Sequence, residues 1–226
     1  MNFPGNFLHL GSVDIGRLRQ QVDDLTAQQW ADYAVRQKRY EVHRDTETIG
    51  LVFDPDFRHS HPTRLPMLEI FHDAIYPALE LVAGHYENSE QGKALAEQFG
   101  LGYFIRATLV RLKAGGAIDP HQDNNFSLTH SHRVHLPIVT TDRVFFSVGN
   151  ETMALPAGEL YEINNRRLHA VRNDSSGDRV HLILDFVLPG EKCCCGALLH
   201  PATLCSPQAC MATDRQQIRC NCYPES

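Results

Sequence analysis

The first 192 residues of this 226-residue chain contain no cysteine, and all seven cysteines lie in the residues that follow. No stretch approaches the roughly 18 uncharged apolar residues that a membrane-spanning helix needs. The start of the chain lacks the basic region and the apolar run of a secretory signal. A disulfide-rich secreted scaffold is therefore not expected. We expect a cytoplasmic protein that has no membrane partner.

Basic charge is also scarce. The chain carries 21 Lys and Arg against 27 Asp and Glu, a net charge of −6, and the acidic excess lies in residues 1–102. A nucleic-acid-binding protein needs a basic stripe to neutralise phosphates, so that class is not expected. The composition, 42% hydrophobic and 21% charged, is typical of a globular protein. The 13 histidines are many for this length, and they direct attention to a metal site.

Helical periodicity comes first along the chain, and strand-like alternation follows it. Apolar residues at helical spacing predict three helices, over 13–35, 65–83 and 89–99. Residues 40–64 are expected to mix a short strand with loop. Alternating residues between Gly, Pro, Asn and Asp turns predict strands at 103–113, 133–139, 143–149, 159–163 and 179–188.

This order of elements favours an α+β fold built on an antiparallel barrel of the jelly-roll or cupin kind. We expect residues 1–102 to form a helical N-terminal part that packs on the barrel. Residues 103–189 form the barrel itself, and residues 190–226 form a cysteine-rich tail in which the periodicity stops.

One histidine and one aspartate in the barrel have the spacing of a metal site. In an extended segment, residues i and i+2 point the same way, so His121 and Asp123 can offer a nitrogen and an oxygen to one ion. The spacing alone is weak, because His43 and Asp45 share it and are interpreted as surface polar residues. His169 follows 46 residues after Asp123, in a strand-like run. Two histidines and one carboxylate are the ligand set of non-haem Fe(II) oxygenases.

An arginine stands in a suitable place for the co-substrate of such an enzyme. Arg179 lies ten residues after His169 and opens the last predicted strand. A 2-oxo acid that binds iron through its keto end leaves its far carboxylate in need of a cation, and the planar fork of arginine matches a carboxylate. By alternation, Arg179 and His181 share one face of their strand, and Arg133 and His135 share one face of another. Two strands therefore offer polar pairs to one cavity.

These motifs resemble a known family. Three segments resemble the aspartyl/asparaginyl β-hydroxylase family of Fe(II)- and 2-oxoglutarate-dependent oxygenases. They are PHQD, then RVHLPIV after nine further residues, and later ALPAGELYEINNRRLHAVRNDSSGDRVHLILDFV. The resemblance covers about residues 103–188 and implies a double-stranded β-helix fold. It implies iron ligands at His121, Asp123 and His169. It also implies that Arg179 binds 2-oxoglutarate, and that Arg133 and His135 line the same pocket and help to hold the co-substrate or substrate.

The chain departs from the family pattern at two positions. Asp123 completes a full ligand triad, which the animal β-hydroxylases lack and the bacterial relatives that act on free amino acids keep. Val110 stands where a serine that binds the co-substrate is expected, so that Thr108 or Arg111 is a candidate to replace that contact.

The implied reaction is hydroxylation of an amino acid, free or within a peptide, of the Asp, Asn or Pro type. It consumes O₂ and 2-oxoglutarate and releases succinate and CO₂. Two other classes stay open. A cupin-type metalloenzyme that does not use 2-oxoglutarate could occupy the same barrel and would not need Arg179. A non-catalytic interaction module would depend on the cysteine-rich tail instead.

The tail lies outside the resemblance and lacks a paired C-x₂-C signature. A zinc or other thiolate–metal site, free thiols, and a redox or partner role all stay open for it. The candidate ligands of a second metal site are Cys193, Cys195, Cys205, Cys210, Cys220 and Cys222.

Overall fold

The computed structural model describes residues 5–31, 44–57, 59, 61–123 and 126–191. The predicted thiolate site of the tail lies outside these residues. The strands are β1 Phe7–Ser12, β2 Thr46–Phe53, β3 Thr63–Arg64, β4 Tyr103–Leu112, β5 Ala117–His121, β6 His132–Val139, β7 Val144–Val148, β8 Glu151–Met153, β9 Glu159–Ile163, β10 His169–Asn173 and β11 Arg179–Val187. The helices are α1 Gly16–Asp23, α2 Ala27–Ala31, α4 Met67–Glu87, α5 Glu90–Phe99 and α6 Phe126–Thr129.

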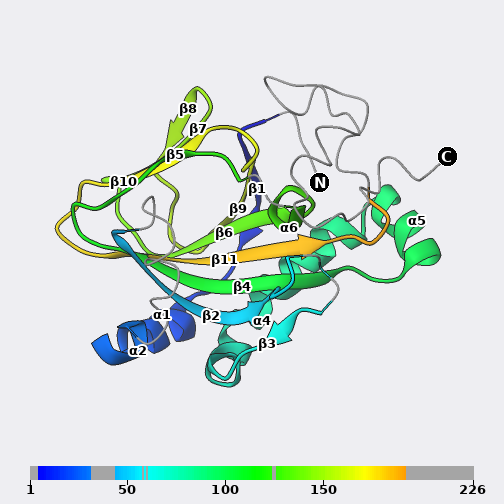
Figure 1. Cartoon of the computed structure of the whole chain (residues 1–226), viewed down its shortest axis with the longest axis horizontal. Coiled ribbons are helices and arrows are strands. Elements are labelled where there is room, and N and C mark those ends of the chain that lie inside the picture. Colours follow the sequence, from blue (N-terminus) through cyan, green and yellow to red (C-terminus); the bar gives the residue numbers. More distant parts are fainter. Residues whose placement is uncertain (1–4, 32–43, 58, 60, 124–125, 192–226) are drawn as a thin grey trace.

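The described strands form two antiparallel sheets. The larger sheet has the order β1-β9-β6-β11-β4-β2-β3, and the smaller has the order β5-β10-β7-β8. From β4 onward the chain crosses repeatedly between the sheets, because β4, β6, β9 and β11 lie in the larger one and β5, β7, β8 and β10 in the smaller one (Figure 1). This alternation is the arrangement of a jelly roll, which was predicted from the spacing of the strands.

Each strand of the larger sheet alternates between two environments. On β11, Val180, Leu182, Leu184 and Phe186 join a hydrophobic core that includes Phe71, Ile75 and Val82 of α4. The intervening residues of β11 face the smaller sheet, and a second apolar cluster lies there. Helices α1, α2 and α4 therefore cover one face of the larger sheet and leave the other face to the interior of the barrel. None of the described helices is long and apolar enough to cross a membrane.

The five strands predicted from alternation are confirmed to within one residue at each end. The prediction of a single helix over 13–35 is wrong, because two short helices, α1 and α2, lie within the described residues of that range. Thr26 and Gln29 form a capping box between them: the Gln29 N–H donates to Thr26 Oγ1 at 3.2 Å, and the Thr26 N–H donates to Gln29 Oε1 at 2.9 Å. This pair of bonds starts a new helix at α2. Strand β1, which pairs with β9 at the edge of the sheet, has no counterpart among the predicted elements.

Candidate metal centre and its cavity

Strand pairing brings the predicted metal ligands together. His121 ends β5 and His169 begins β10, and the two are direct partners in the antiparallel ladder. Asp123 follows β5, and its backbone N–H donates to the carbonyl oxygen of Asn165 at 3.1 Å. One ligand atom from each of His121, Asp123 and His169 lies within 4.8 Å of the others. The three residues therefore form a group that could hold one ion.

The two histidines have the tautomer that a metal site requires. His121 Nδ1 lies 2.8 Å from the carbonyl oxygen of Asp119, and His169 Nδ1 lies 3.0 Å from that of Arg167. A carbonyl only accepts hydrogen bonds, so both Nδ1 atoms carry the proton and both Nε2 atoms keep their lone pairs. Backbone carbonyls that orient histidines in this way are typical of metal sites. Burial lowers the pKa of His169, which favours the neutral ring.

Asp123 is held in place by a buried arginine. Arg133 Nη1 donates to Asp123 Oδ2 at 2.8 Å, and Asn165 Nδ2 donates to the same oxygen at 3.1 Å. The other edge of the Arg133 guanidinium makes two bonds with Asp185, at 2.8 and 2.9 Å. The carboxylates of Asp123 and Asp185 raise the pKa of Arg133 despite its burial, so its charge is permanent. Arg133 thus bridges two carboxylates and fixes one oxygen of Asp123.

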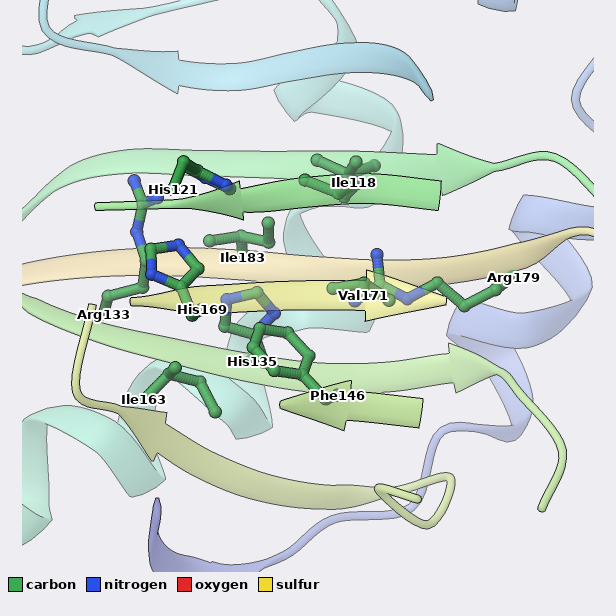
Figure 2. A pocket seen from close by; sticks show the side chains of 11 residues that line it. Ile118, His121, Arg133, His135, Phe146, Ile163, His169, Val171, Arg179 and Ile183 are labelled. Carbon is green, nitrogen blue, oxygen red and sulfur yellow. The ribbon is translucent and has the colours of Figure 1, made fainter. Parts of the chain in front are cut away.

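A narrow cavity runs from the metal centre into the barrel. His121, His169 and Arg133 lie at one end of it, and Arg179 extends into it from the other end (Figure 2). The lining side chains come from both sheets: Val110, Ile118, His121, Arg133, His135, Phe146, Ile163, His169, Val171, Arg179 and Ile183.

Arg179 is a buried cation that forms no ion pair with a described carboxylate. It is 1% exposed, and its Nε and Nη1 atoms have no hydrogen-bond partner among the described residues. Burial lowers the pKa of Arg179 to about 9, so the guanidinium is still charged at neutral pH. A buried charge without a counterion is costly, so this end of the cavity is suited to an anion.

His135 stands between the two ends of the cavity as a neutral imidazole. Burial, together with the charges of Arg179 and Arg133, holds its pKa well below the usual range. Its ring contacts Phe146 edge-on at a centroid distance of 5.1 Å, and its Nδ1 has no partner among the described residues. His135 therefore offers a polar contact in an otherwise apolar stretch of wall.

Five of the six residues predicted for the barrel site line this cavity. The sixth, Asp123, is outside the lining and joins the site through His121, His169 and Arg133.

Neither candidate to replace the missing serine, Thr108 or Arg111, lines the cavity. Arg111 bonds with Glu47, and its guanidinium carbon lies 4.4 Å from the centre of the Trp30 ring. Val110 does line the cavity.

Three further residues hold the predicted ones: Asn165 contacts Asp123, His181 contacts Arg179, and Asp185 contacts Arg133. The sequence pattern placed His181 on the cavity face without a specific role, and it did not single out Asn165 or Asp185. Strand alternation was a usable signal for two of them, because His181 and Asp185 share the face of Arg179 on β11. Asn165 gave no such signal, because it lies in a turn.

The comparisons with known proteins agree with the motifs. Residues 90–189 match the model of the aspartyl/asparaginyl beta-hydroxylase family, which confirms the resemblance. No curated protein matches the chain in sequence. The family match and the His–Asp–His group support an oxidoreductase of the iron- and 2-oxoglutarate-dependent oxygenase class.

Two solved structures are similar in outline. One is an oxidoreductase of the 2OG-Fe(II) oxygenase family from Burkholderia pseudomallei, with 15% identity, a TM-score of 0.48, and coverage of 77% of this chain and 90% of that chain. The other is the viral collagen prolyl hydroxylase vCPH from Paramecium Bursaria Chlorella virus-1, with 11% identity, a TM-score of 0.47, and coverage of 81% and 96%. At TM-scores below 0.5, these similarities carry no functional argument.

Proposed function

We propose that this protein is an Fe(II)- and 2-oxoglutarate-dependent hydroxylase that acts on an amino acid or an amino-acid residue of the Asp, Asn or Pro type. The observation that carries the proposal is one cavity with a His–Asp–His group at one end and an uncompensated arginine at the other. A cupin-type metalloenzyme that does not use 2-oxoglutarate has no need for that arginine.

The residues present fit both groups. Two imidazole nitrogens and a carboxylate are the ligand set of non-haem Fe(II) oxygenases, and they leave coordination positions open. The unpaired donors of Arg179 suit the far carboxylate of a 2-oxo dicarboxylic acid. The cavity encloses about 40 Å³, room for only a few water molecules. Binding of 2-oxoglutarate therefore requires side chains of the cavity lining to move.

The residues of the metal centre and the cavity have separate functions. His121, His169 and Asp123 hold the metal, and Arg133 keeps Asp123 in position. Arg179 binds the far carboxylate, and the apolar side chains around it exclude water and strengthen that ion pair. When bound, iron and 2-oxoglutarate supply the oxidation that places one oxygen atom of O₂ in a substrate C–H bond, while 2-oxoglutarate leaves as succinate and CO₂.

The test measures turnover directly. Purified protein is loaded with Fe(II) and 2-oxoglutarate and supplied with O₂, and succinate is quantified across free amino acids and short peptides that contain Asp, Asn or Pro. We expect succinate release that is stimulated by one substrate group and matched one-to-one by hydroxylated product. Metal binding without any binding of 2-oxoglutarate would favour the cupin-type alternative instead.

The contact between Arg133 and Asp123 leads to a separate prediction. Replacing Arg133 by Lys keeps the charge, but an ammonium group cannot bond both carboxylates in the plane of the fork. We expect the affinity for Fe(II) or Mn(II) to fall about 10- to 100-fold, as is usual when a partner of a metal ligand is removed. Titration calorimetry measures it, with the exposed Arg172→Lys as the control. Unchanged metal affinity combined with weaker 2-oxoglutarate binding would assign Arg133 to the co-substrate instead.

A further inference from the structure

One histidine holds the guanidinium of Arg179. Arg179 and His181 lie two residues apart on β11 and face the same side, and Arg179 Nη2 lies 2.6 Å from His181 Nδ1. Both residues are 1% exposed. A guanidinium only donates hydrogen bonds, so His181 Nδ1 accepts and its Nε2 carries the proton. Burial, with the charge of Arg179 beside it, holds the pKa of His181 well below the usual range, so the ring stays neutral and Nδ1 keeps its lone pair.

The surroundings of His181 give Arg179 little other support. The register partner of His181 on β4 is Val110, and its partner on β6 is Pro137, so neither neighbouring side chain can form a hydrogen bond. Among the described residues, Arg179 Nε and Nη1 and His181 Nε2 have no partner. The bond between Nη2 and Nδ1 therefore determines how the guanidinium is oriented in the cavity.

On the basis of the proposed function, we propose that His181 is a positioning residue for 2-oxoglutarate. It holds one nitrogen of Arg179 so that the remaining donors point at the far carboxylate of the co-substrate. Arginine carries several rotatable bonds, and fixing them before binding reduces the entropy lost when the ligand arrives.

The experiment measures 2-oxoglutarate affinity without turnover, by calorimetry on Mn(II)-loaded protein. His181→Leu keeps the approximate size but removes the acceptor, and we expect about 10-fold weaker binding. His181→Asn places an amide oxygen on the same carbon that carries Nδ1, and we expect affinity within about threefold of the wild type. The affinity for Mn(II) and the melting temperature should change little in either variant. His181→Gln carries its amide one bond further out, and it should behave like His181→Leu; it replaces that variant if His181→Leu does not fold.

A double-mutant cycle separates positioning from a merely structural role. If His181 acts through Arg179, His181→Leu should have almost no further effect on 2-oxoglutarate affinity in an Arg179→Lys background. Equal affinity of wild type and His181→Leu would overturn the role of His181 and leave the proposed function intact. A wild-type protein that binds Mn(II) but no 2-oxoglutarate would overturn the proposed function, and the role of His181 with it.

Discussion

Replacing His169 by alanine is expected to lower the affinity for Fe(II) or Mn(II) by at least about 100-fold, because it removes a direct ligand, and loss of an outer partner alone costs 10- to 100-fold. The remaining pair, His121 and Asp123, would hold the ion at only two points. Activity should be lost together with the metal. Iron content after anaerobic loading, and calorimetric titration with Mn(II), measure the effect.

The matched control for this variant is His72→Ala. His72 lies on the exposed side of α4, where its Nδ1 contacts the Asp73 carboxylate at 3.1 Å. We expect its metal content to equal that of the wild type. The His169→Ala variant should keep its fold, because its strand β10 remains paired on both sides with β5 and β7. Full iron occupancy in folded His169→Ala would show that the metal is bound elsewhere.

The second large effect is expected at Arg179. Truncating one partner of a buried, hydrogen-bonded charge pair costs about 2–5 kcal/mol, so Arg179→Met should weaken 2-oxoglutarate binding by about 30-fold or more. Arg179→Lys should recover only part of the loss, because a point charge cannot reproduce the fork. The affinity for Mn(II) should remain close to that of the wild type, since Arg179 lies at the far end of the cavity from the metal ligands.

The stability of the Arg179→Met variant should show whether Arg179 binds a ligand or supports the fold. Without ligand, the wild-type protein carries the cost of a buried charge that forms no ion pair with a described carboxylate. The free energy of unfolding of Arg179→Met should therefore equal or exceed that of the wild type. Added 2-oxoglutarate should raise the melting temperature of the wild type but not of the variant. Arg172→Met, at an exposed position, should respond to 2-oxoglutarate like the wild type. A large loss of stability in Arg179→Met without ligand would indicate a structural arginine.

The elements that the sequence predicted well are those in which burial follows a simple period. Strand β11 alternates between residues buried against the helices and residues facing the cavity, and this pattern is visible in the sequence. The prediction of one helix over 13–35 is wrong because the apolar spacing continues across residues 24–26, where the chain leaves the helix. The capping box at Thr26 interrupts the helix there. The register of β1 against β9 depends on contacts more than 140 residues apart, and local pattern does not carry that information.

By itself, the sequence determined the chemistry of the candidate site. The types and order of His121, Asp123, His169 and Arg179 indicated a metal and an anionic co-substrate, and alternation placed Arg133 and His135 at the same cavity. Only the tertiary structure decided which of these groups already have partners. It paired Arg133 with Asp123 and Asp185, and it left Arg179 without a described carboxylate. The physical reason is that charge compensation in a buried site depends on distances between strands that are far apart in the chain, and strand pairing alone sets those distances.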